Sequence, residues 1–154
     1  MTKVPILIGV MDKISKSELD YHQQLKYRDS LLYNGVDLLG SFKDTERIEL
    51  GKGMMLMLTI SDNTASLWLG TRVNEILDSL GFKNTRVNSR TPGRENNRVQ
   101  FGWRQATPKE MATLMEKISK GEIIGKEQSA QMLRLLEETI GTNKSFHKFR
   151  PTFL

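Results

Sequence analysis

The sequence contains no cysteine, and this absence removes several kinds of chemistry at once. Disulfide bonds, thiolate metal sites and a cysteine nucleophile are all excluded. Long hydrophobic runs are also missing, because the apolar stretches near residues 4–11 and 54–60 are too short to span a bilayer. No secretory signal peptide is visible, since Asp12 and Lys13 stand where a small-residue cleavage site would follow the first apolar stretch. We therefore predict no membrane span, and any export signal would lie outside these residues.

The residues that are present fit a single domain over positions 1–154. Charged residues make up 27% of the chain and hydrophobic residues 38%, a balance typical of a globular protein with a real core. The formal net charge of +5 would favour anionic partners, but charge alone is weak evidence for nucleic-acid binding. No segment alternates with a period of two over a convincing length, whereas helical spacing recurs. The predicted fold class is mainly α.

Apolar spacing, capping signals and glycine stops predict six helices. The first should run from about Lys3 to Ser15 and lie centrally, because it is apolar nearly all round. A capping box with proline at the first helical position, Thr107-Pro108-Lys109-Glu110, should open another helix, which stops at Gly121. The other helices are expected at 49–60, around 67–69 before Gly70, at 73–80 before Gly81, and at 132–140 before Gly141. Residues 20–47 should form connections and short elements, and residues 82–106 a long loop.

The expected long loop carries an excess of positive charge. Between residues 83 and 105, Lys83, Arg86, Arg90, Arg94, Arg98 and Arg104 face a single acid, Glu95. Three interpretations stay open: a solvated loop with local ion pairs, an electropositive rim that attracts a substrate carboxylate, or a nucleic-acid surface. The aromatic residues of this segment lack a recognisable RNA-binding pattern, so we predict no nucleic-acid partner.

The most informative polar residues are Ser61, Asp62 and Asn63, which close the apolar run over residues 54–60. At the end of a buried helix, a hydroxyl, a carboxylate and an amide can point together into one cleft. The ordinary alternative is a helix stop followed by the N-cap of the next helix, because all three residue types favour caps. A Ser-Asp-Asn triplet is also one of three elements of penicillin-recognising serine hydrolases, beside S-x-x-K and K-T-G.

Four further segments accompany the triplet in a fixed order along the chain. They are Lys3-Val4-Pro5-Ile6-Leu7, Val73-Asn74-Glu75-Ile76-Leu77-Asp78-Ser79-Leu80-Gly81, Asn84-Thr85-Arg86 and Thr107-Pro108-Lys109-Glu110-Met111-Ala112. Together with the triplet they resemble the class A β-lactamase superfamily over nearly the whole chain. The resemblance implies the helical subdomain of the β-lactamase/transpeptidase-like fold, with the antiparallel sheet largely missing. It also implies a small-molecule acyl substrate, no cofactor, and a periplasmic or extracellular location.

The resemblance assigns a role to each matching residue. Lys3 would be the S-x-x-K lysine and act as base, and Ser61 would relay a proton to the leaving nitrogen. Asn63 would hold the substrate amide, while Asp62 would orient the turn rather than react. Class A enzymes also place a deacylating glutamate in the long loop. Glu95 is the candidate for that role, although its neighbours differ from the family pattern.

Two parts of the family pattern do not occur among these residues. The nucleophilic serine precedes the motif lysine by three residues, so its position falls immediately before Met1, and Thr2 is out of register to replace it. No K-T-G or K-S-G occurs either. We therefore expect an inactive chain, truncated at both ends, from a β-lactamase-like hydrolase of β-lactam, ester or peptide-like substrates. The alternative is a non-catalytic helical module or degenerate relative that binds a ligand or partner without turnover.

Other signals are weaker. His22 and His147 are far apart without metal-ligand spacing, so we predict no metal site. Met54, Met55 and Met57 are expected to fill the core. Without the sheet, apolar faces of the helical subdomain would lack a packing partner, and we expect self-association through the uncovered apolar face.

The missing nucleophile leads to a direct prediction. The 154-residue chain should show no covalent labelling by a fluorescent penicillin, because the serine in register with Lys3 is not among its residues. In-gel fluorescence of the purified chain after incubation with the probe measures this. Stoichiometric labelling would contradict the prediction.

Overall fold

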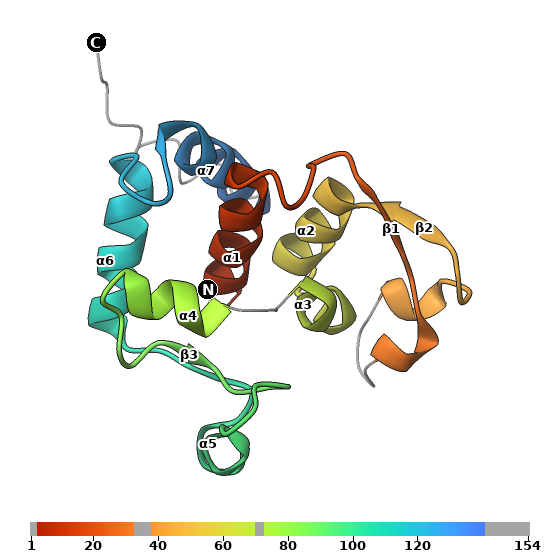
Figure 1. The fold of residues 1–154 in the computed structure, drawn as a ribbon, viewed down its shortest axis with the longest axis horizontal. Coiled ribbons are helices and arrows are strands. Elements are labelled where there is room, and N and C mark those ends of the chain that lie inside the picture. The colour runs from red at the N-terminus through yellow and green to blue at the C-terminus, as the bar shows by residue number, and fades with distance from the viewer. Residues whose placement is uncertain (1–2, 33–37, 70–72, 141–154) are drawn as a thin grey trace.

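The computed structural model describes residues 3–32, 38–69 and 73–140, which are mostly helical, as predicted (Figure 1). No helix among these residues is long and apolar enough to cross a membrane. The elements are α1 (Val4–Ser15), β1 (Gln24–Lys26), the 3-10 turns η1 (Asp29–Leu31) and η2 (Leu39–Ser41), β2 (Arg47–Glu49), α2 (Leu50–Thr59), α3 (Asn63–Leu69), α4 (Val73–Ser79), β3 (Arg86–Val87), α5 (Glu95–Phe101), β4 (Arg104–Gln105), α6 (Pro108–Ser119) and α7 (Lys126–Ile140).

Helix α1 is the centre of the molecule. Every residue from Val4 to Met11 is buried, which confirms that a helix apolar nearly all round lies inside the fold. It packs against α3, α4 and α7, while Pro5 occupies the first turn, where a missing N–H costs nothing. Each fully buried Leu or Ile side chain here stabilises the fold by about 1.5–3 kcal/mol. The position of α1 therefore decides where the residue just before it, Lys3, can lie.

Helix α2 leads directly to the polar triplet. It packs against α3 and α7 and buries Met54 and Met57 completely, which confirms their predicted place in the core. Gly51 has a packing reason, because a Cβ atom there would lie 2.6 Å from Cε1 of Tyr21. The strands β1 and β2 pair antiparallel, with Leu25 opposite Ile48, and β2 runs straight into α2.

The prediction that residues 82–106 form a long loop was wrong. This segment contains the antiparallel pair β3–β4, with Arg86 opposite Gln105, and the seven-residue helix α5. A two-residue strand is too short to show alternation, and α5 buries none of its residues, so it needs no apolar stripe. Helices α3 and α7 also begin earlier than predicted, at Asn63 and Lys126. Gly70, Gly141 and His147 lie outside the described residues.

The predicted capping box at α6 is only half formed. The Thr107 hydroxyl accepts the N–H of Glu110 at 3.3 Å, and Pro108 opens the helix as expected. The Glu110 carboxylate, however, turns to the segment before β3. It accepts the N–H groups of Lys83, Asn84 and Thr85 at 2.6–3.1 Å, together with the Thr85 hydroxyl at 2.7 Å. Helix α6 is thereby fastened to the start of the segment that carries β3 and α5.

These hydrogen bonds change the acidity of Glu110. Burial of the carboxyl group would raise its pKa, but the Thr85 hydroxyl and the donors of Asn84 and Lys83 outweigh that effect. The pKa falls from 4.5 to about 2. Because the folded-state pKa is lowered, Glu110 contributes stability that is complete above its unfolded pKa and is lost as the pH falls toward 2.

We predict that Glu110→Gln removes part of the acid sensitivity of the fold. The loss should be about 1–2 kcal/mol of unfolding free energy near neutral pH, and much less near pH 3. Denaturant melts at several pH values measure this. Glu127→Gln, which makes the same charge change at an exposed position on α7, is the control. Parallel stability profiles for Glu110→Gln and the unaltered chain between neutral pH and pH 3 would contradict the assignment.

Candidate functional site

The structure brings Lys3 to the polar triplet. Lys3 stands just before α1 and is 5% exposed. Its Nζ donates to the carbonyl oxygen of Ser61, to the carbonyl oxygen of Asp62 at 2.8 Å and to Oδ1 of Asn63 at 3.5 Å. These partners lie 58 to 60 positions away along the chain. A buried ammonium group needs such acceptors, because an unpaired charge inside a protein is very costly.

The turn after α2 presents Ser61 to the surface. Asp62 donates its N–H to the carbonyl of Leu56 at 3.2 Å, which closes the last turn of α2. Ser61 has a φ of 62°, in the left-handed region that residues other than glycine seldom occupy. Such a conformation costs on the order of 1 kcal/mol and persists where the surrounding contacts determine it. The result is an exposed hydroxyl residue whose carbonyl points back to Lys3.

Asp62 holds this turn from within. Its side chain is fully buried, and Oδ1 accepts the N–H of Ala65 at 2.7 Å, which caps the start of α3. Oδ2 accepts the N–H groups of Leu38 and Leu39 at 3.0 and 3.1 Å. The carbonyl of Asp62 accepts the Ser66 hydroxyl at 2.7 Å. The carboxylate thus joins η2, the triplet and α3. Asp62 therefore caps α3 as an ordinary helix cap would, and the same triplet also binds Lys3.

The arrangement suits proton transfer next to a bound carbonyl compound. Lys3 offers an amine from the start of α1, and the turn after α2 offers the surface hydroxyl of Ser61 and the half-buried amide of Asn63. The carbonyl oxygens at Nζ can also accept hydrogen bonds from the ammonium group that forms when a lysine base has taken up a proton. Placement of this kind is the first requirement for general acid–base catalysis.

Glu95 lies on a different element from this cluster. It is exposed in the first turn of α5, and its Oε1 accepts the N–H of Gly93 at 3.2 Å. Neighbouring bonds fix the segment: Arg94 Nε donates to Asn88 Oδ1 at 2.8 Å, and Arg94 Nη2 donates to Gln105 Oε1 at 3.2 Å. No hydrogen bond joins Glu95 to Lys3 or the triplet within the described part of the chain.

The sequence alone did not indicate which residues hold the base of this segment. The Asn74 amide makes two hydrogen bonds to the backbone of Val87, as a neighbouring strand would. Its Nδ2 donates to the Val87 carbonyl at 2.7 Å, and its Oδ1 accepts the Val87 N–H at 2.8 Å. Arg86 donates to the carbonyls of Phe82 and Thr85 and pairs with Asp78. Asn74, Asp78 and Arg86 do occur in the segments that resemble the family, but the sequence offers no further sign of these bonds.

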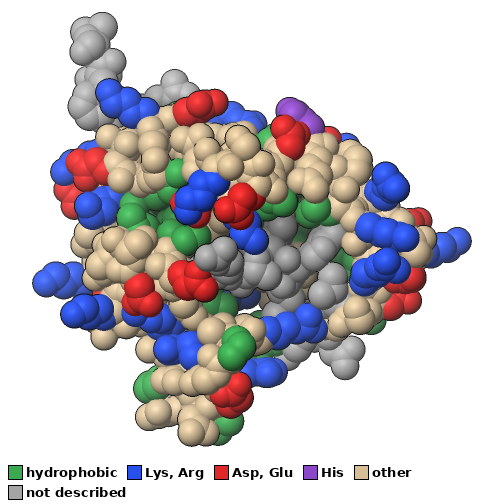
Figure 2. Space-filling view, viewed as in Figure 1, with side chains coloured by type: hydrophobic (Ala, Val, Ile, Leu, Met, Phe, Trp, Pro, Cys, Tyr) green, Lys and Arg blue, Asp and Glu red, His purple; other side chains and the backbone are tan. Residues whose placement is uncertain are grey.

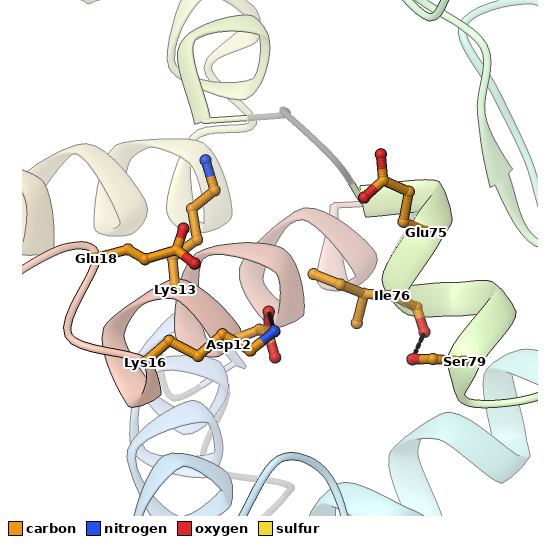
Figure 3. Close-up of a pocket in the computed structure, with 7 residues that line it drawn as sticks. All are labelled: Asp12, Lys13, Lys16, Glu18, Glu75, Ile76 and Ser79. Atoms are coloured by element: carbon orange, nitrogen blue, oxygen red, sulfur yellow. Dashed lines mark hydrogen bonds and ion pairs between the residues drawn. The ribbon is translucent and has the colours of Figure 1, made fainter.

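Other parts of the described chain offer little for catalysis or metal binding. A hollow of about 230 Å³ between the end of α1 and α4 is lined by Asp12, Lys13, Lys16, Glu18, Glu75, Ile76 and Ser79 (Figure 3). Three acids and two lysines line it, and Lys16 pairs with Asp12 at 2.7 Å. Among the described residues no group of three or more His, Cys, Asp or Glu could hold a metal ion. His22 is exposed, with Nδ1 2.8 Å from Glu49 Oε1.

Known proteins show the same arrangement of helices. The model of a family described as the Beta-lactamase enzyme family matches residues 1–149. The β-lactamase of Sphaerobacter thermophilus is 23% identical, with a TM-score of 0.76 over 89% of this chain and 53% of that one. PBP-A is 26% identical, with a TM-score of 0.76 over 90% of this chain and 52% of that one. The TLA-1 extended-spectrum β-lactamase is 22% identical, with a TM-score of 0.72 over 97% and 58% of the two chains.

The chain therefore spans about half the length of the solved structures that it matches. No curated protein matches it by sequence. The matched range covers nearly all of the 154 residues, which confirms the resemblance carried by the five ordered segments. The chain belongs to the β-lactamase enzyme family, and its described residues form the helical part of that fold.

Proposed function

We propose that the protein is a serine hydrolase that forms an acyl-enzyme, and that this chain supplies the lysine and Ser-Asp-Asn side of its active site. The observation that carries the proposal is the convergence of Lys3 Nζ on the Ser61 and Asp62 carbonyls and on Asn63 Oδ1. An ordinary helix cap would explain the Asp62 side chain, but it would not explain why a buried lysine from the start of α1 binds the same turn. Family membership supplies independent support.

In the proposed mechanism the neutral amine form of Lys3 acts as base toward a serine placed three residues before it. One helical turn puts such a serine on the same side of the helix as Lys3. The ammonium group that forms is stabilised by the two carbonyl oxygens that already accept from Nζ. Ser61 then passes the proton to the leaving nitrogen, and Asn63 binds the amide of the acyl substrate.

The proposed substrates are β-lactam, ester or peptide-like acyl compounds. A PBP-A variant has been captured as an acyl-enzyme complex with penicillin G, which supports this class. Glu95 stays a prediction for the deacylating base. Because Glu95 stands on α5 and its carboxylate accepts the Gly93 N–H, we expect slow release of the acyl group unless that contact breaks. The proposed site of action is the periplasm or cell exterior.

The reading frame around this chain tests the proposal first. We predict a serine codon immediately before Met1 and a K-T-G-like triplet downstream of Leu154. In-frame stop codons at both ends would contradict this and favour the non-catalytic module that binds without turnover.

The protein encoded by that longer frame should then be labelled by a fluorescent penicillin. Lys3→Met should abolish labelling, and Ser61→Ala should slow acylation about a hundredfold or more, because each removes a proton-transfer group. Ser79→Ala removes a hydroxyl that donates to the Ile76 carbonyl within α4 and is the matched control. Equal acylation rates for Ser61→Ala and Ser79→Ala, measured by stopped-flow or gel densitometry, would overturn the assigned relay.

A further inference from the structure

The carbonyl oxygen of Asp62 is shared between the buried lysine and a neighbouring hydroxyl group. It accepts Lys3 Nζ at 2.8 Å, the Ser66 hydroxyl at 2.7 Å and the Ser66 N–H at 3.3 Å. A carbonyl oxygen has two lone pairs, so three donors compete for this one atom. All three residues are buried, and water therefore has little access to relieve the competition.

This shared acceptor lies where the protein buries its charge. On the face seen in Figure 2, lysine and arginine side chains reach the surface. Among the described residues, by contrast, the only buried charged side chains are those of Lys3 and Asp62, which meet at one turn. An ammonium group without acceptors is costly inside a protein. The strength of its few acceptors therefore decides between the charged and the neutral form of Lys3.

The bond from Ser66 would be ordinary without the lysine. A serine inside a helix often donates to the carbonyl four residues before it, and such a bond alone carries no function. Ser129 shows a comparable bond: its buried hydroxyl donates at 2.8 Å to the Ile123 carbonyl, which also accepts the Gly125 N–H at 2.6 Å. The Ser66 bond differs because its acceptor also binds an ammonium group from 59 positions away.

We propose, on the basis of the function proposed for Lys3, that Ser66 is a positioning residue whose hydroxyl weakens the bond from the Asp62 carbonyl to the Lys3 ammonium group. Each donor withdraws electron density from the shared oxygen, so each makes that oxygen a poorer acceptor for the others. The charged form of Lys3 depends on this acceptor more than the neutral form does. The Ser66 hydroxyl thereby keeps the amine available as a base.

Other charged groups near Lys3 are the same with or without the Ser66 hydroxyl. Helix α3, which carries Ser66, has no charged residue, and Asp12 and Lys13 lie at the other end of α1. The Asp62 carboxylate accepts three backbone N–H groups, which no change at Ser66 removes. The described charged side chains of α2, α4 and α7 are exposed, namely those of Lys52, Glu75, Asp78, Lys126, Glu127, Arg134 and Glu137.

Nuclear magnetic resonance of the 154-residue chain measures the effect, with the carbon-13 shift of Lys3 Cε followed as the pH is raised. We expect Lys3 to titrate about half a pH unit or more higher in Ser66→Ala, because fewer donors then compete for the carbonyl. Ser66→Thr keeps the hydroxyl and should titrate as the unaltered chain does. Ser129→Ala removes the comparable buried hydroxyl and is the matched control. Circular dichroism checks that each variant is folded.

A Lys3 titration point in Ser66→Ala that is equal to or below that of the unaltered chain would overturn the proposal. An equal rise in Ser129→Ala would overturn it too, because any lost buried hydroxyl would then have the same effect. A Lys3 that stays charged in the unaltered chain up to alkaline unfolding would also overturn it, since no amine would be available. None of these measurements needs the nucleophilic serine, so they decide the role of Ser66 even if the longer protein is not labelled by penicillin.

If the longer protein is labelled, its pH profile gives a second readout. Acylation of Ser66→Ala should be about threefold slower than that of the unaltered protein below the Lys3 titration point, because half a pH unit reduces the amine fraction by that factor. The rate should recover above that point. A loss of rate that is the same at every pH would contradict the assigned role.

Discussion

The contact on which the rest of this structure depends is the one between the buried ammonium group of Lys3 and the carbonyl oxygens of Ser61 and Asp62. A charge that is 5% exposed must have partners, so the start of α1 and the turn after α2 have to meet. Asp62 secures the other side of the turn through three backbone N–H groups. These contacts on either side of Ser61 hold its backbone in the left-handed conformation.

A second set of bonds organises the segment after α4. Glu110, Asn74 and Arg86 hold its first residues, and each of them lies outside α5. The helix itself is free of the core and carries its apolar and basic side chains outward. The chain thus combines a site held around Lys3 with a projecting lobe around α5 that is fastened at its base (Figure 1).

Apolar periodicity predicted α1, α2 and α6 because these helices bury a face, and burial requires a pattern. It missed α5 because that helix packs on almost nothing. The local sequence predicted the wrong partner for Glu110, because groups distant in the sequence compete for it. Its position matches a capping box, yet its carboxylate accepts the N–H groups of residues 83–85. For the site, family resemblance paired Lys3 with the triplet, but no sequence pattern showed that Glu95 begins a helix and accepts the Gly93 N–H.

The central claim is that the Lys3 ammonium group binds the backbone of the Ser61–Asp62 turn, and nuclear magnetic resonance tests it most directly. In a chain labelled with nitrogen-15 and carbon-13, the protons on Lys3 Nζ should exchange slowly with water. Their nitrogen should show scalar coupling across hydrogen bonds to the carbonyl carbons of Ser61 and Asp62. A rapidly exchanging Lys3 ammonium without such coupling, in a chain that is otherwise folded, would contradict the account.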